Sequence, residues 1–147
     1  MKFLFDRMLV RLGRWLRAAG YDTVIIEDDR EDLKIYEQAV QEGRFVVTRD
    51  KHFLGFPEAD KVVLFLKSND IEECARELSE LIEIDWTHKP FSRCLVCNGE
   101  LEKGSAEQMD QAPPDVTEGD WCKECNKLYW KGSHTDKMLK KLQEWKK

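Results

Sequence analysis

Short apolar runs alternate with longer stretches of helical spacing through the first part of the chain. The short runs are rich in β-branched and aromatic residues, and they occupy residues 2–5, 23–26, 45–48 and 62–66. Apolar residues spaced three or four apart mark three helices, over residues 7–19, 33–40 and 71–84. Gly20 and Gly43 end the first two helices, as glycine commonly does. Strands and helices that alternate at these lengths predict an α/β fold with a mostly parallel central sheet.

The pattern changes near residue 90. A proline, paired cysteines and scattered glycines follow, and the segment 104–119 is typical of a loop. A lysine-rich stretch over residues 135–147 carries apolar residues at helical spacing, which predicts an amphipathic terminal helix. We therefore expect one domain over residues 1–89 and a small module over residues 90–147.

Composition fits a folded core but not a general nucleic-acid binder. The 147 residues are 41% hydrophobic and 36% charged, with a formal net charge of −5 at pH 7. Residues 1–89 carry 14 basic and 19 acidic residues, whereas residues 90–147 carry 10 of each. Because phosphate contacts need Lys and Arg, RNA binding requires a local concentration of basic residues.

Nothing in the sequence indicates a membrane segment or a signal peptide. No stretch reaches the roughly 18 consecutive apolar residues of a membrane span. An acidic residue, Asp6, comes too early for a signal peptide. We therefore expect a cytoplasmic protein without a membrane partner.

Acidic residues follow each of the four expected strands. The carboxyl ends of parallel strands meet at one edge of a sheet, where α/β proteins bind ligands. Grouped carboxylates repel one another unless a divalent cation compensates them, and Mg²⁺ or Mn²⁺ prefers such oxygen ligands. A metal held there can activate water and stabilise charge during phosphodiester hydrolysis. The candidate catalytic residues are Asp6, Asp29, Asp32, Asp50 and Asp70.

Each of these aspartates also has a simpler interpretation as a helix N-cap. Asp accepts hydrogen bonds from the free amides at a helix start and complements the helix dipole. Asp32 and Asp70 are the most open to that interpretation, since each stands at the start of an expected helix. Asp6 and Asp50 follow apolar strands on the same expected edge, which capping alone explains less well.

A ridge of arginines is expected beside the acidic edge. Arg7, Arg11 and Arg14 recur on one face of the first helix, and Arg49 directly precedes Asp50. Arginine binds phosphate through two parallel hydrogen bonds, so these residues are candidates for seating an RNA backbone. The alternative is a solvated helix face whose arginines pair with surface acids.

Two Cys-x-x-Cys pairs, Cys94 with Cys97 and Cys122 with Cys125, are separated by 24 residues. Each pair can offer two thiolates to one tetrahedral Zn²⁺, so we expect a small zinc ribbon with a structural metal. Four thiolates leave no open position for water, which argues against a catalytic role for this metal. Redox dithiols are the alternative, and the presence of a second pair argues against them.

The run that follows the second pair contains both aromatic and basic residues. Tyr129 and Trp130 can complete the small core of the ribbon, and Lys131 and His134 are candidates for contacting RNA. The fifth cysteine, Cys74, lies in an expected helix, where we expect it to be a small buried hydrophobic residue.

Several motifs occur together in one order along the chain. They are Asp6-x-Met8-Leu9, Gly13-Arg14-Trp15-Leu16-Arg17, Gly20-Tyr21-Asp22-Thr23, Thr48-Arg49-Asp50, the two cysteine pairs and Tyr129-Trp130-x-Gly132-Ser133-His134. Over almost its whole length the chain thereby resembles the Mut-seven C-terminal RNase family. The resemblance implies a PIN-like three-layer nuclease domain followed by a zinc ribbon. It also points to Asp6, Asp50 and an acid at the start of the second helix, best matched by Asp32, with Asp28 and Asp29 close by.

The leading hypothesis is a metal-dependent ribonuclease that acts on single-stranded RNA, with Mg²⁺ or Mn²⁺ at the carboxylates and structural Zn²⁺ at the cysteines. An RNA-binding or ribosome-associated adaptor without turnover is the alternative, and metal dependence separates the two. A receiver-like phosphorylation switch also gathers aspartates at strand ends. It needs an acidic pair after the first strand, however, where this chain has Asp6 alone.

Overall fold

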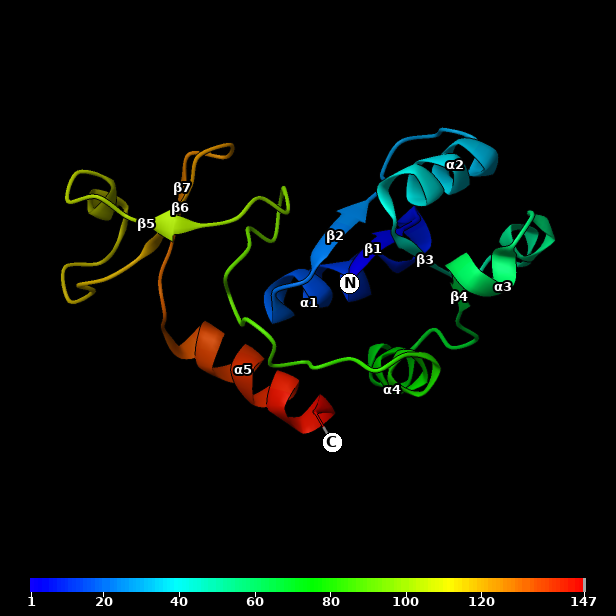
Figure 1. Cartoon of the computed structure of the whole chain (residues 1–147). Helices are drawn as coiled ribbons and strands as arrows, with labels where there is room; N and C mark the ends of the chain where they lie inside the picture. The colour runs from blue at the N-terminus through cyan, green and yellow to red at the C-terminus, as the bar shows by residue number, and fades with distance from the viewer. Residues whose placement is uncertain (147) are drawn as a thin grey trace.

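A four-stranded sheet forms the centre of the computed structural model, which describes residues 1–146 (Figure 1). The strands are β1 (Lys2–Phe5), β2 (Asp22–Ile25), β3 (Phe45–Thr48) and β4 (Val63–Phe65). They run in the order β2-β1-β3-β4, and every neighbouring pair is parallel. The expected α/β fold with a parallel sheet is confirmed, and the bounds of β2 and β4 differ from the expected ones by one residue at each end.

Helices and short turns connect and follow these strands. The helices are α1 (Val10–Ala19), α2 (Asp32–Glu42), α3 (Ala59–Val62) and α4 (Ile71–Leu81). Two 3-10 turns, η1 (Arg7–Leu9) and η2 (Lys51–Gly55), begin just after β1 and β3. The sequence pattern did not predict η2 and α3, because the segment that contains them lacks regular apolar spacing. A local cap favours η2, because the Asp50 side chain accepts a hydrogen bond from the His52 amide.

The sheet buries side chains on both of its faces, as the alternation of side chains along a strand requires. Phe3 and Phe5 of β1 point into a core that α1 and α4 cover, whereas Leu4 points into a second core under α2, η2 and α3. All three of these β1 side chains are fully buried. Helices therefore lie on both faces of the sheet, which gives three layers (Figure 1).

The second part of the chain forms a small antiparallel sheet and a longer helix. The sheet has the order β5-β6-β7, from β5 (Glu102–Lys103), β6 (Asp120–Cys122) and β7 (Lys127–Tyr129). A 3-10 turn, η3 (Gln108–Gln111), lies within the loop between β5 and β6. The final helix, α5 (Ser133–Trp145), begins two residues earlier than expected. Lys147, the last residue of the expected helix, lies outside the described residues.

Helix α5 returns to the first part of the chain and packs against it (Figure 1). Leu142 is fully buried in the same core as Leu12 of α1. The ring of Trp145 lies 5.0 Å from the ring of Trp15 and 5.0 Å from that of Trp86, edge to face in both cases. The hydrophobic core therefore continues from the parallel sheet into the C-terminal helix. None of the helices within residues 1–146 combines the length and apolar character needed to cross a bilayer.

Candidate active site and metal centre

The order of the strands places a topological switch point, the position at which α/β folds form a ligand crevice, at the carboxyl ends of β1 and β3. From β1 the chain crosses to β2 on one side, and later returns to β3 on the other side of β1. Crossovers that leave in opposite directions open a gap at this point, and α/β proteins bind their ligands there. Asp6 directly follows β1, and Asp50 lies two residues beyond the end of β3. Asp6 and Asp50, the two candidates that capping alone explains less well, thus lie at the topological switch point.

Asp6 is buried, with only 6% of its surface exposed. Its Oδ2 accepts a hydrogen bond of 2.5 Å from the Thr48 hydroxyl, and its Oδ1 accepts one of 3.1 Å from the Met8 amide at the start of η1. Burial raises the pKa of Asp6, the two hydrogen bonds lower it, and the nearby charges of Asp50 and Asp32 raise it further, with a net upward shift. The site therefore holds a carboxylate whose negative charge lacks compensation.

Asp50 and Asp32 are joined by His52, a histidine that no sequence motif singled out. The Oδ1 of Asp50 accepts a 2.9 Å hydrogen bond from the His52 amide, which caps η2. The Nδ1 of His52 lies 2.9 Å from the Oδ2 of Asp32, in the first turn of α2. Only the fold brings α2 and η2 together, so no local motif could have revealed this pair. The one local signal for His52 was its position two residues after Asp50, and this position does not indicate a contact with Asp32.

The donor set of this crevice suits a hard divalent cation. Three carboxylates from different segments influence one another here, and Mg²⁺ and Mn²⁺ are held by a few such oxygens plus water. Within residues 1–146 the oxygens of Asp6, Asp32 and Asp50 do not all lie within 4.8 Å of one another, whereas those of a closed site would. Water molecules in the coordination shell can span that difference, since Mg²⁺ keeps several of them.

The remaining acidic candidates are engaged elsewhere. Asp29 is exposed and pairs with Arg7, while the neighbouring Asp28 pairs with Arg30. Asp70 accepts a 3.1 Å hydrogen bond from the Glu73 amide and caps α4. The interpretation of Asp70 as a helix cap, set out from the sequence, thus matches its contacts. Asp32, in contrast, is the first residue of α2, after the cap position, and it makes no cap hydrogen bond.

The arginine candidates line the outer surface of α1 and the end of β3. Arg11 and Arg14 are exposed, and Arg14 lies 4.0 Å from Glu27, a loose contact between two exposed side chains. Arg49 donates from Nη1 to the Ser68 carbonyl at 3.4 Å. Its buried Nε has no hydrogen-bond partner within residues 1–146. Such orphaned donors are rare in folded proteins.

The four cysteines form a second and separate centre. Their sulfur atoms all lie within 4.8 Å of one another, with Cys94 and Cys125 at 3.8 Å and Cys97 and Cys122 at 3.4 Å. A Zn–S bond of about 2.3 Å in a tetrahedron implies sulfur separations near 3.8 Å. The four thiols are thus positioned to hold one zinc ion. Among residues 1–146 this is the only group of three or more metal-ligating residues gathered so closely.

One of these thiols is prepared for metal binding by its surroundings. Burial opposes ionisation of Cys94, but hydrogen bonds from the Tyr129 hydroxyl and from the Cys97 and Val96 amides outweigh it and lower the pKa of Cys94 to about 6. The thiolate is the form that binds zinc. Tyr129 therefore supports the cysteine centre directly, beyond filling the small core of the ribbon.

The first cysteine pair is hydrogen bonded to the parallel sheet through Arg17. This side chain is 6% exposed and donates to the carbonyls of Leu95 at 2.9 Å and Val96 at 3.1 Å. The same guanidinium donates to the Thr23 carbonyl in β2 at 2.9 Å. The turn between Cys94 and Cys97 is thus held by a buried cation from α1, which also offsets the negative charge of nearby thiolates.

Asn98 makes a second connection on the same side. Its Oδ1 accepts from the Thr23 amide at 2.9 Å and its Nδ2 donates to Asp22 at 2.7 Å, so it satisfies polar groups along the free edge of β2. Gly20 closes α1 with a φ of 101°, and a side chain there would collide with the Lys89 carbonyl at 2.4 Å. Glycine is therefore required at this close approach.

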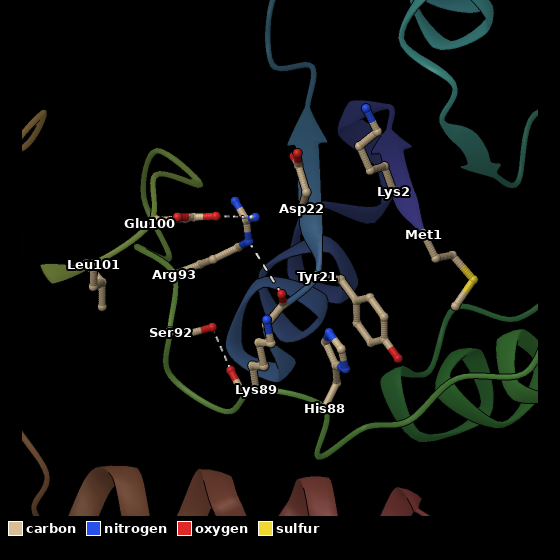
Figure 2. A pocket seen from close by; sticks show the side chains of 11 residues that line it. Met1, Lys2, Tyr21, Asp22, His88, Lys89, Ser92, Arg93, Glu100 and Leu101 are labelled. Atoms are coloured by element: carbon tan, nitrogen blue, oxygen red, sulfur yellow. Dashed lines mark hydrogen bonds and ion pairs between the residues drawn. The ribbon is translucent and has the colours of Figure 1, made fainter.

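A cavity of about 660 Å³ lies beside this joint, at the edge of the sheet where Lys2 and Asp22 begin their strands. Arg93, which lines this cavity, donates to the Gly20 carbonyl at 3.4 Å and pairs with Glu100. Figure 2 shows the contact between Arg93 and Glu100. This is the opposite edge from Asp6 and Asp50, so the larger cavity is not part of the carboxylate site. A smaller cavity of about 400 Å³ includes Lys131 and His134, at the start of α5, in its lining.

Comparison with known families identifies the chain. The model of the Mut7-C RNAse domain matches residues 1–142, which covers the parallel sheet, the cysteine centre and most of α5. No curated protein and no solved structure matches the sequence significantly. The match extends over nearly the whole of the 147 residues and agrees with the resemblance carried by the sequence motifs. The chain therefore belongs to the Mut7-C RNAse domain family.

Proposed function

We propose that this protein is a metal-dependent ribonuclease that hydrolyses phosphodiester bonds of single-stranded RNA at the crevice between β1 and β3. One observation carries the proposal. Asp6 is buried at the topological switch point with its pKa raised by burial and by the charges of Asp50 and Asp32. Keeping an uncompensated carboxylate in such a place costs stability, and a divalent cation would remove that cost. The family membership supports a ribonuclease-type function.

The chemistry divides between the cation and the chain. Mg²⁺ or Mn²⁺, when bound, lowers the pKa of a coordinated water and stabilises charge on the phosphate. Asp6, Asp50 and Asp32 hold the cation, and the Thr48 hydroxyl fixes the orientation of the Asp6 carboxylate. Asp32 also engages the Nδ1 of His52, which leaves Nε2 as the ring nitrogen that can exchange a proton with the departing oxygen.

Substrate binding is assigned to the arginines that adjoin the acidic crevice. Arg7 and Arg11 lie on the exposed side of η1 and α1, starting directly after Asp6. Arg14 extends the row by one helical turn, and Arg49 lies at the end of β3. Guanidinium groups in this arrangement can bind successive phosphates of one strand. Asp29 then has the supporting role of holding Arg7, with which it pairs.

The decisive experiment measures cleavage of a labelled single-stranded RNA by the purified, zinc-loaded protein with and without Mn²⁺. We expect Asp6→Asn and Asp50→Asn to lower the rate by about a thousandfold or more, because both remove a metal ligand. Asp70→Asn is the matched control: it also changes an acid after a strand, but Asn still caps α4, so the rate should stay within about twofold of the wild type. Unchanged rates in both site variants would place the catalytic residues elsewhere.

A second candidate function is an RNA-binding adaptor without turnover. One observation favours it: Asp6, Asp32 and Asp50 do not form a close cluster of metal ligands within residues 1–146, as the residues of a closed metal site would. Such an adaptor would bind RNA equally well with and without Mg²⁺ and would leave the strand intact. The same cleavage assay, run beside a binding assay, distinguishes the two functions.

A further inference from the structure

A cavity of about 400 Å³ lies between the cysteine centre and the start of α5, apart from the carboxylate crevice. All of its lining residues fall between positions 91 and 138, so none of them belongs to the parallel sheet or to the acidic site. Its volume is within the usual range for small-ligand sites, about 300 to 1,000 Å³. The proposed ribonuclease chemistry makes no use of it.

The inner surface of this cavity is mainly apolar. Phe91, Leu95, Leu128 and Met138 contribute side chains, and Trp130 joins them from the residue after β7. Trp130 keeps 37% of its surface exposed, although large aromatic side chains are usually well buried. An exposed indole at the border of an apolar cavity offers a flat face on which a planar ring can stack.

The polar part of the lining contains more basic than acidic side chains, in contrast to the acidic chain as a whole. Lys127, Lys131, Arg93 and His134 line the cavity together with one acid, Asp120. Two of the cations are already engaged: Arg93 pairs with Glu100, and the Lys127 ammonium lies 4.9 Å above the Tyr129 ring. Lys131 and His134 are exposed and have no ion-pair partner within residues 1–146.

These features fit one class of ligand. An apolar wall with an exposed indole suits a planar base, and an unpaired lysine with a histidine beside it suits a phosphate. Proteins that bind single strands combine the same two elements, aromatic stacking and a basic groove along the backbone. A base paired in a duplex is stacked on both faces and cannot enter such a cavity.

We propose that this cavity binds one unpaired nucleotide of an RNA strand, with the base against Trp130 and the adjoining phosphate at Lys131 and His134. The proposal rests on the ribonuclease function in one respect: the strand held here is the substrate cleaved at the β1 and β3 crevice. The cavity is then a second anchoring point that selects single-stranded over duplex RNA.

The test measures binding of a fluorescein-labelled single-stranded RNA by anisotropy, using the full-length, zinc-loaded protein without Mg²⁺ or Mn²⁺. We expect Lys131→Gln combined with His134→Gln, and separately Trp130→Ala, to raise the Kd by about tenfold, since each removes one element of the site. Lys137→Gln is the matched control, because it removes one charge from the exposed surface of α5 outside the cavity; its Kd should change less than about twofold. Zinc content and unfolding temperature verify that each variant is folded.

Three results would overturn the proposal. One is a Kd for the Lys131 and His134 variant that equals that of Lys137→Gln. Another is wild-type affinity in Trp130→Ala, and the third is equal binding of single-stranded and duplex RNA, which would indicate a purely electrostatic surface.

The outcome is separable from that of the proposed function. Asp50→Asn should bind RNA at least as tightly as the wild type in the metal-free binding assay, because it removes a negative charge from the carboxylate site. The cavity variants should cleave saturating RNA at the wild-type kcat with a raised KM. Cavity-dependent binding without any cleavage would contradict the ribonuclease proposal and leave this one standing. If the protein cleaves RNA and the cavity variants bind RNA as tightly as the wild type, the cavity proposal is contradicted and the ribonuclease proposal stands.

Discussion

The hydroxyl of Thr48, the last residue of β3, donates a 2.5 Å hydrogen bond to the Oδ2 of Asp6, the residue that follows β1. The same hydroxyl accepts a 3.0 Å hydrogen bond from the Asp50 amide. One buried oxygen therefore links the two acids at the switch point and sets the direction of the Asp6 carboxylate.

Thr48→Val should remove the hydrogen bond that orients the Asp6 carboxylate while leaving Asp6 itself in place. Valine keeps the β-branched shape in this fully buried position but cannot donate to Asp6. We expect kcat to fall by about 10-fold to 100-fold, with little change in KM, as is typical when the partner of a metal ligand is lost. Thr48→Ser, which restores the hydroxyl, should recover most of the rate. Equal rates in the valine and serine variants would assign Thr48 to packing alone.

Asp6→Asn should stabilise the protein when divalent cations are absent. Because burial and neighbouring charges raise the pKa of Asp6, the ionised form is disfavoured in the folded state, and stability declines as the pH rises through that raised pKa. The neutral amide removes this penalty at neutral pH, so the Tm of Asp6→Asn without divalent cations should be higher than that of the wild type. Thermal unfolding of the zinc-loaded protein measures it.

Addition of Mn²⁺ should reverse that ranking. The cation binds only the folded wild type and therefore raises its Tm with concentration, whereas Asp6→Asn should respond weakly. A lower Tm for Asp6→Asn without metal would instead identify Asp6 as a structural cap of η1.

Asp22 should give the protein an acid-sensitive component of stability. Burial raises its pKa, but hydrogen bonds from Arg44 and Asn98 outweigh burial and hold the pKa below its ordinary value of 3.8. A lowered pKa stabilises the folded state at pH values above the ordinary pKa, and that stabilisation is lost as the pH falls through the folded value. Asp22→Asn should lower the free energy of unfolding by about 1 to 2 kcal/mol at pH 7. The difference from wild type should shrink below about pH 4 in urea titrations; a constant difference would contradict the assignment.

Zinc removal should destabilise the parallel sheet together with the cysteine centre. Arg17 joins the turn of the first cysteine pair to β2, so we expect a single thermal transition that moves to lower temperature when zinc is chelated. Two transitions, of which only one responds to zinc, would show that the parts unfold independently.

The matched substitutions Arg17→Met and Arg14→Met isolate that connection. Loss of Arg17 leaves three carbonyls without their donor and should cost about 2 to 4 kcal/mol, while zinc remains bound in stoichiometric amount. Arg14 lies on the same helix with an exposed side chain, and its loss should stay within about 0.5 kcal/mol. Equal effects of the two substitutions would remove Arg17 from the connection.

The sequence predicted those parts of the structure that depend on local periodicity and fixed spacing. The β1 bounds and the two cysteine pairs follow from neighbours along the chain. For each aspartate the sequence allowed both a capping and a metal-binding interpretation. Only the fold showed that Asp70 caps α4, and that Asp6 caps η1 at a position close to two other acids, Asp50 and Asp32.

Contacts between distant segments could not be predicted. The pairing of His52 with Asp32 needs α2 to lie beside η2, and the burial of Arg17 needs the cysteine turn to fold back on α1. Trp130 was expected in a small core, yet it keeps much of its surface exposed because it follows the end of β7. Each of these depends on tertiary packing, which overrides local pattern.

The packing of Trp145 between Trp15 and Trp86 has a consequence for how the protein is made. While the chain is being synthesised, the parallel sheet can assemble before α5 has emerged, and Trp86, fully covered in the finished protein, then lacks one of its aromatic neighbours. An apolar surface left open on a nascent chain favours association with other chains or with chaperones. Folding of this part of the protein is therefore completed only after α5 has left the ribosome, and a version truncated before α5 should be prone to aggregate.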